Sequence, residues 1–173
     1  MKPDYKTLLI FLLLIGCDNI KEPTPIQKPV SGLNNEEEII DKIEKTNQLL
    51  NKAVLDGDYE TQLKYFTQNA IIDPPLDPEI KGKNNLRASF EKNKKENVIF
   101  HSFSGTIKNY WVCGNKVYET GQWSLLVSSD KLKKPYAFVG SYFQIWEKQQ
   151  DDTYLISYNI FTYDFNPFDV YKF

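Results

Sequence analysis

The feature that most constrains the fold is the second half of the chain, which contains four long β-type segments in succession. These segments are residues 98–113, 116–128, 135–147 and 153–164. Short turn signals such as Gly114-Asn115 separate them, so we predict an antiparallel meander. Strands of this length rarely stay flat, and Gly105, Gly121 and Gly140 are positions at which we expect bulges or bends that curl the sheet.

The first half of the chain is predicted to supply three helices. Apolar residues recur at helical spacing from Ile39 to Val54, Asp58 is a suitable N-cap for a second, shorter helix, and a third begins near Asn84. Residues 70–72 predict a short strand between the second and third helices. The predicted fold is α+β, a cone-shaped domain in which three N-terminal helices pack on a strongly curved antiparallel sheet.

The N-terminal residues predict export and a lipid anchor. Lys2 and Lys6 precede an apolar run, residues 8–15. This run has the length of a signal-peptide core and is too short to span a bilayer. The stretch Leu14-Ile15-Gly16-Cys17 resembles the lipobox of bacterial lipoproteins, in which the cysteine is acylated. The alternative is a cytosolic protein with an apolar N-terminal helix.

This interpretation predicts three parts of the chain. Residues 1–16 form the signal peptide, residues 17–33 carry the acylated Cys17 and a Pro-rich tether, and residues 34–173 form a single domain. The protein is then held on a membrane of the bacterial cell envelope through Cys17, facing the periplasm or the cell surface. With Cys17 acylated, Cys113 has no disulfide partner and is expected to be a small buried residue.

Charge and composition argue against nucleic-acid binding. The formal net charge is -2, and Arg87 is the only arginine, whereas nucleic-acid-binding domains carry basic patches rich in arginine. The sequence has no spacing of His, Cys, Asp and Glu typical of a metal site, so we predict neither a metal nor a cofactor.

Local motifs resemble those of one superfamily. The front half of ketosteroid-isomerase-like and SnoaL-like domains resembles the stretches Asp56-Gly57-Asp58, Tyr65-Phe66, Asn69-Ala70, Asp73-Pro74 and Lys81-Gly82-Lys83. Residues 142–148 and 154–159 resemble their closing hairpin. The order of the predicted elements resembles the nuclear transport factor 2-like fold. The resemblance extends from about Glu36 to Asn166, and it implies a pocket that can serve isomerases, cyclases, dehydratases or non-enzymatic binders.

Asp73 is the first candidate site residue. In ketosteroid isomerases an aspartate before a proline, nine residues ahead of the glycine that precedes the third helix, is the proton-shuttling base, and Asp73 stands at that offset from Gly82. The resemblance also puts Leu50 and about Phe143 at the two donors of the oxyanion hole. Neither side chain can donate, so steroid isomerisation is not expected. Asp73 is a residue that ends a strand, a polar contact in a pocket, or a general base.

Two further residues are candidate catalytic partners. Glu119 is in phase with apolar residues of its strand, so its carboxylate is buried with a raised pKa if that face points inward, or exposed if Gly121 forms a bulge. His101 shares a strand face with apolar residues, and it is either a hydrogen-bonded core residue or a catalytic partner.

Aromatic side chains supply the candidate ligand contacts. We select Tyr136, Tyr142, Trp123 and Tyr158, because an aromatic cavity with a few hydroxyl groups is the usual form of a small-molecule site. The alternative is that these rings pack in the core or in a dimer interface.

The functional prediction is a non-catalytic binding or accessory module whose pocket takes a small, partly apolar molecule. One alternative is an isomerase, cyclase or dehydratase that uses Asp73 as general base with His101 or Glu119. The other is a homodimeric or partner-docking structural protein of the envelope.

Overall fold

The computed structural model describes residues 33–164, with side chains from Glu36 onward. The chain divides into two units, Met1–Leu33 and Asn34–Phe173. The predicted signal peptide, the lipidation site Cys17 and the tether lie outside the described residues, as do the residues after Asp164. Within the described part of the chain, no helix has the length and apolar character needed to cross a bilayer.

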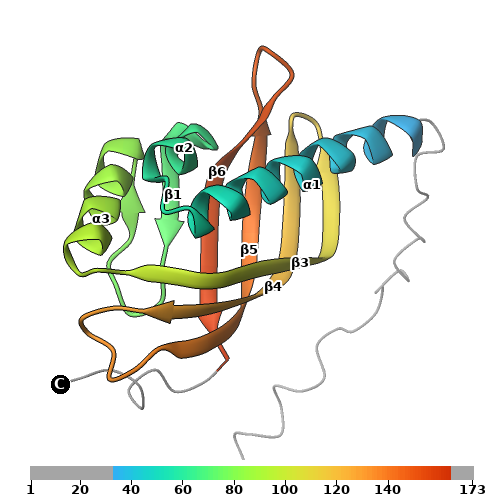
Figure 1. Cartoon of the computed structure of the whole chain (residues 1–173). Coiled ribbons are helices and arrows are strands. Elements are labelled where there is room, and N and C mark those ends of the chain that lie inside the picture. The colour runs from blue at the N-terminus through green and yellow to red at the C-terminus, as the bar shows by residue number, and fades with distance from the viewer. Residues whose placement is uncertain (1–32, 165–173) are drawn as a thin grey trace, which may run out of the picture. The chain divides into compact units, whose positions relative to one another are not determined.

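Three helices and one six-stranded sheet form the described domain (Figure 1). The helices are α1 (Leu33–Leu55), α2 (Tyr59–Lys64) and α3 (Lys83–Lys95). The strands are β1 (Phe66–Asp73), β2 (Ile80–Lys81), β3 (Ile99–Cys113), β4 (Lys116–Ser128), β5 (Tyr136–Lys148) and β6 (Tyr154–Tyr163). Their order in the sheet is β2-β1-β6-β5-β4-β3, and the sheet curls around the helices without closing. The predicted α+β class is confirmed.

The long strands form the predicted meander, because β3 to β6 pair antiparallel with their sequence neighbours. The sheet is nevertheless mixed, since β1 pairs with β6 in parallel. This pairing joins elements far apart in sequence, and turn residues predict only the pairing of strands that follow one another in the chain. The two-residue strand β2, which pairs antiparallel with β1, was not predicted.

The sequence predicted bulges or bends at the glycines, but the bulges of the sheet lie at other residues. The registers shift around His101 and Lys108 in β3 and around Ser157 in β6. Gly121 and Gly140 instead make room for rings on the concave face: a Cβ at Gly121 would overlap the hydroxyl of Tyr142, and one at Gly140 would lie 2.7 Å from the indole ring of Trp123. Each bulge reverses the phase of the residues that follow it.

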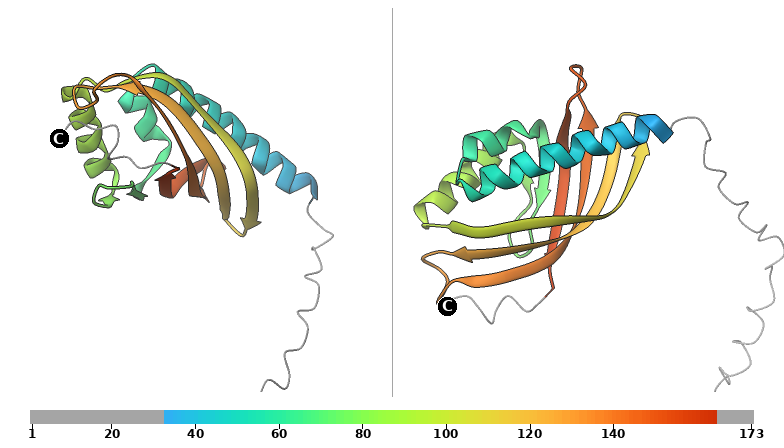
Figure 2. Two further views of the ribbon diagram at one scale, coloured as in Figure 1. Left: turned by 90° about the horizontal axis from the view of Figure 1, so that it is seen from below. Right: turned by 45° about the vertical axis from the view of Figure 1, so that its right-hand side comes forward.

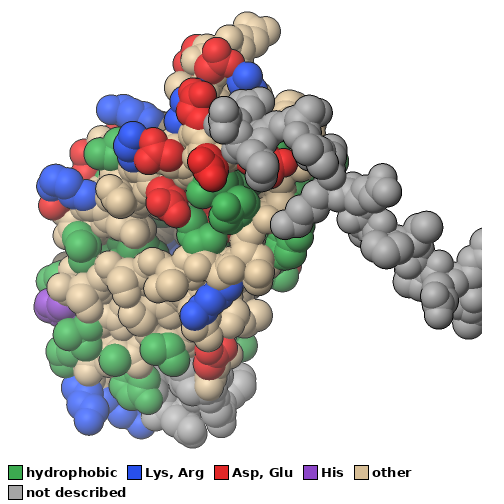
Figure 3. All heavy atoms as spheres, turned by 90° about the vertical axis from the view of Figure 1, so that its right-hand side faces the viewer, with side chains coloured by type: hydrophobic (Ala, Val, Ile, Leu, Met, Phe, Trp, Pro, Cys, Tyr) green, Lys and Arg blue, Asp and Glu red, His purple; other side chains and the backbone are tan. Residues whose placement is uncertain are grey.

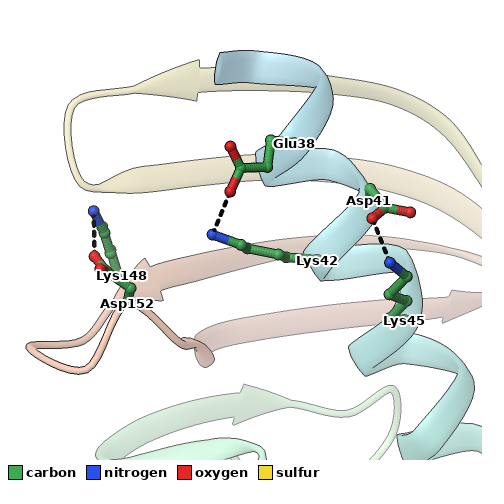
Figure 4. Close-up of polar contacts among 6 residues, drawn as sticks. All are labelled: Glu38, Asp41, Lys42, Lys45, Lys148 and Asp152. Atoms are coloured by element: carbon green, nitrogen blue, oxygen red, sulfur yellow. Dashed lines mark hydrogen bonds and ion pairs between the residues drawn. The ribbon is translucent and has the colours of Figure 1, made fainter. Parts of the chain in front are cut away.

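Helix α1 packs its apolar side on the sheet and exposes charges on the other. Glu38 and Lys42 form an ion pair of 2.9 Å, and Asp41 and Lys45 form one of 2.6 Å (Figure 4). In the β5–β6 hairpin, Lys148 and Asp152 form a third pair, of 2.7 Å. These pairs are exposed, so they contribute little to stability, and the burial of the apolar side holds the helix.

Three separate clusters make up the core. Ile40 and Ile43 of α1 pack on the sheet through residues such as Trp146. Leu63, Ile72 and Leu86 join α2, β1 and α3. At the far end of the curved strands, residues Trp123, Val127, Leu132 and Phe138 form the third cluster. Figure 2 shows the helices over one part of the concave face and the long strands curving away from them. Since a domain of this size usually has one contiguous core, the space between the clusters is of functional interest.

Candidate functional site

A cleft of about 1400 Å³ lies between the helices and the concave face of the sheet. The sheet lines it mainly with aromatic side chains and a few polar ones: Trp123, Phe138, Tyr142, Gln144, Asn159 and Phe161. The helices contribute Asn47, Leu50, Val54, Tyr59 and Phe90. Residues from all three core clusters line this one space.

The aromatic wall of the cleft is built around Trp123, which is 8% exposed. Its ring contacts Phe161 edge-on with centroids 5.9 Å apart and Tyr163 with centroids 5.6 Å apart. The indole N–H of Trp123 has no hydrogen-bond partner among the described residues. An unmet buried donor is uncommon in folded proteins.

At the inner end of the cleft lies a buried carboxylate. Glu119 is 1% exposed. Its oxygens accept hydrogen bonds from the Tyr142 hydroxyl at 2.5 Å, from the Trp146 indole N–H at 2.7 Å and from the Asn47 amide at 3.4 Å. All three donors are neutral. Among residues 36–164, no Lys, Arg or His forms an ion pair with Glu119.

Burial dominates the protonation equilibrium of this group. Removal from water raises the pKa of Glu119 above its usual value, the three hydrogen bonds oppose that rise, and the charge of Glu44 adds to it. The pKa of Tyr142 is also raised, because its hydroxyl is buried and lies beside the Glu119 carboxylate. Tyr142 therefore keeps its proton and donates it to Glu119.

A row of polar residues crosses β4, β5 and β6, and two of its members, Gln144 and Asn159, line the floor of the cleft. Glu119, Gln144 and Asn159 stand opposite one another on β4, β5 and β6. The amide of Asn159 donates to the side-chain oxygen of Gln144 at 2.8 Å. The cleft thus has hydrogen-bonding groups on its floor and an apolar wall, and this combination fixes the orientation of a small molecule.

Of the four predicted ligand-binding residues, Trp123 and Tyr142 line the cleft. Tyr136 lies on the same face, but its ring packs edge-on against Phe138 at a centroid distance of 5.1 Å and is not part of the lining. Tyr158 pairs with Ile145 on the other face of the sheet. The bulge at Ser157 reverses the phase of β6, and for that reason Tyr158 does not face the cleft.

Asp73 lies at the end of β1 and does not line the cleft. It stands opposite Ile160, which in turn stands opposite Phe143, and both face the convex side of the sheet. The preceding residue, Ile72, is the one that points into the cleft. Asp73 forms no hydrogen bond or ion pair with another described side chain. Three strand spacings, roughly 14 Å, and the sheet itself separate Asp73 from Glu119.

His101 is exposed, which corrects the expectation of an interior histidine. It sits at a bulge of β3, and its Nε2 lies 2.9 Å from the hydroxyl of Ser128. The one histidine of the chain is visible at the surface in Figure 3. Ser128 is nine residues along β4 from Glu119, roughly 30 Å by strand rise. The three predicted catalytic candidates are therefore not brought together.

Two other expectations need correction. Cys113, expected to be buried, is a free and exposed residue at the end of β3. Phe143, placed by the resemblance at the strand acid of ketosteroid isomerases, stacks on Tyr118 at a centroid distance of 6.3 Å on the convex face. The inward residues are its neighbours Tyr142 and Gln144, and Tyr142 is able to donate a hydrogen bond.

The sequence reasoning missed Asn47 and Gln144. Asn47 follows the buried Ile43 by four residues, so a polar side chain on the buried face of the first helix was the available signal. Gln144 is in phase with Tyr142 and Trp146 on one strand, and a buried amide in that stripe was the corresponding signal.

No protein-family model matches this sequence, and no curated protein matches it. Solved structures do. A ketosteroid isomerase-like protein from Erwinia carotovora atroseptica superposes with a TM-score of 0.66 at 14% identity, covering 76% of this chain and 99% of the other. A nuclear transport factor 2-like superfamily protein from Salmonella enterica superposes with a TM-score of 0.64 at 12% identity, covering 76% of this chain and 95% of the other. A putative dehydratase from Streptomyces avermitilis superposes with a TM-score of 0.59 at 11% identity, covering 76% of this chain and 99% of the other. The chain therefore has the nuclear transport factor 2-like fold.

Proposed function

We propose that the protein binds a small, partly apolar molecule in the cleft and does not catalyse a reaction on it. The observation that carries this proposal is the cleft itself, about 1400 Å³ lined by aromatic side chains with a short polar floor. Pockets for small molecules typically measure about 300–1000 Å³, so the space is sufficient for a ligand. A large apolar surface kept open inside a domain is costly unless something occupies it.

The positions of the acidic residues support a binding role over catalysis. A general base must come within hydrogen-bond reach of its substrate. Asp73 faces away from the cleft, and Glu119 lies behind Tyr142 and Asn47 rather than in the lining. The fold includes a putative dehydratase among its solved examples, but the fold alone carries no activity.

The test is dye binding to residues 18–173 with a matched pair of variants on α1. Val54 lines the cleft, whereas Leu49 is 55% exposed and does not. We expect an apolar fluorescent dye such as anilinonaphthalene sulfonate to bind the wild type, Val54→Trp to weaken binding at least tenfold, and Leu49→Trp to leave it unchanged. An absence of dye binding, or equal effects of the two variants, would remove the cleft as the site.

We propose further that the domain is held on an envelope membrane by acylation of Cys17. The support is the sequence from Leu14 to Cys17 after a charged start and an apolar run. Mass spectrometry of the protein made in a bacterium that processes lipoproteins is expected to show a mature chain beginning at Cys17 with added acyl chains. Cys17→Ser should leave the precursor unprocessed. An unmodified mature chain would contradict the anchor.

A homodimer through the convex face of the sheet is a second candidate. Trp111 is 54% exposed there, next to Tyr118 in the ladder, and Phe143 stacks on Tyr118. The neighbouring row carries the uncharged Asn109 and Thr120, so a strongly charged partner would find no matching charge and a second copy fits better. Sedimentation of residues 18–173 should show a dimer, and Trp111→Glu a monomer. A wild-type monomer at 100 μM would contradict this candidate.

A further inference from the structure

The hydrogen-bond inventory of Tyr142 limits what a ligand can offer it. A hydroxyl group has one proton to donate and lone pairs that accept. Tyr142 gives its proton to Glu119 at 2.5 Å, while its side chain lines the cleft. A ligand atom that meets this hydroxyl must therefore be a donor. An ether or carbonyl oxygen would meet an acceptor instead.

Among the described residues, no cation pairs with the carboxyl group of Glu119. Buried carboxylates are usually paired with a cation, because an isolated charge in a low-dielectric interior is costly. Here the three donors are the neutral side chains of Tyr142, Trp146 and Asn47. Glu44, a second acid, also acts on Glu119, and unlike Glu119 it lines the cleft. A cation brought by a ligand would supply the missing countercharge.

The basic side chains of the cleft lie at its other end. Lys131 follows the end of β4, which is nine residues or roughly 30 Å along the strand from Glu119, and it pairs with Glu96 at 2.9 Å. Lys92 is on the C-terminal half of α3. The inner end of the cleft is thus acidic and aromatic, whereas its rim carries the lysines.

Aromatic rings adjoin the acidic end. Phe161 stands opposite Tyr142 in the β5–β6 ladder, and Trp123 packs edge-on against Phe161. The faces of such rings attract ammonium groups, by about 0.5–2 kcal/mol each. The same rings offer apolar area for the remainder of a ligand.

We propose that the ligand of the cleft is a small apolar molecule with a protonated amine, whose ammonium group meets Tyr142 beside Glu119 and whose apolar body lies against Trp123 and Phe161. This proposal rests on the proposed binding function and adds the chemical class of the ligand. A carboxylate is excluded from the same position, because it would face an acceptor and an acid.

The experiment compares three probes with one apolar body. Titration calorimetry at pH 7 measures the affinity of residues 18–173 for 1-aminoadamantane, 1-adamantanol and adamantane-1-carboxylate. We expect the amine to bind about tenfold more tightly than the alcohol, and the carboxylate most weakly. If the amine binds no better than the alcohol, the amine inference is overturned while the binding function stands. If none of the three binds, the inference is overturned, and the dye experiment with Val54→Trp decides the binding function separately.

Variants identify the groups responsible. Glu119→Gln should abolish the preference for the amine and leave the affinity for the alcohol unchanged, whereas Glu147→Gln, on the same sheet but outside the cleft, should preserve the preference. If Glu119→Gln does not fold, Tyr142→Phe keeps the ring, removes the acceptor and should lower the affinity for the amine several-fold. A preference for the amine that survives both substitutions would overturn the proposed position of the ammonium group.

Discussion

Replacing Glu119 by Gln is the perturbation whose consequence for stability is best defined by the structure. The side chain is 1% exposed, and burial raises the pKa of its carboxyl above the usual value of about 4.3. Between the unfolded and the folded pKa, the folded protein holds a proton that the unfolded chain has released. The contribution of this group to stability is therefore fully present below the unfolded pKa and is lost as pH rises through the folded pKa.

The size of this pH effect on the free energy of unfolding is set by the single proton that Glu119 binds. The free energy of unfolding changes by at most about 1.4 kcal/mol per pH unit over that interval, and it is constant above it. Gln cannot ionise, so the variant lacks this loss. Its amide oxygen can accept from Tyr142, but its NH₂ group cannot accept from Trp146, which costs about 1–3 kcal/mol at every pH. Relative to the wild type, the variant should gain stability as pH rises.

The assay is urea unfolding from pH 4 to pH 8, followed by tryptophan fluorescence, for the wild type, Glu119→Gln and Glu147→Gln. The difference between the wild type and Glu119→Gln cancels the titration of the other groups, and Glu147→Gln controls for the loss of one carboxylate from the sheet. A difference that does not change with pH, or that moves in favour of the wild type as pH rises, would refute the account of Glu119.

The remaining predictions concern residues outside the Glu119 cluster. A Cβ at Gly140 would overlap the backbone oxygen of Thr162, so Gly140→Ala should lower the free energy of unfolding by about 1–3 kcal/mol or more. Gly105 has open space around it, so Gly105→Ala should not lower the free energy of unfolding in this way. Equal effects of the two variants in urea unfolding would contradict this prediction. Asp73→Asn should leave dye affinity within twofold of wild type, and a large loss would place Asp73 at the site. Asp58 accepts the N-cap hydrogen bond of α2 from Thr61, so Asp58→Ala should lower Tm and Asp58→Ser should restore most of it; unchanged Tm values would remove the capping role.

The β-rich half of the chain was predictable because its signals are local. The four long strands begin and end within about two residues of the predicted bounds, since turn residues mark each end. The N-cap at Asp58 was predictable for the same reason. By contrast, the parallel pairing of β1 with β6 joins distant segments and has no local signal.

The site was less predictable, because three bulges change which residues face inward. The bulges near His101 and Ser157 contain no glycine, so the sequence does not mark them. A strict two-residue period therefore placed His101 inside and Tyr158 with the interior residues. Glu119 precedes its nearest glycine on a regular stretch of β4, and there the phase argument for an inward carboxylate holds. Its partner Asn47 lies on another element, 72 residues away, and only the fold brings the two together.

The measurement that tests the central claim most directly is an NMR titration of the three tryptophan indole N–H signals with 1-aminoadamantane. Trp123 forms the wall of the cleft, Trp146 donates to Glu119, and Trp111 is exposed on the convex face. The account predicts that the Trp123 signal shifts with saturation, that the Trp146 signal follows it, and that the Trp111 signal stays in place. A titration that moves only the Trp111 signal, or none of the three, would contradict a ligand site in the cleft.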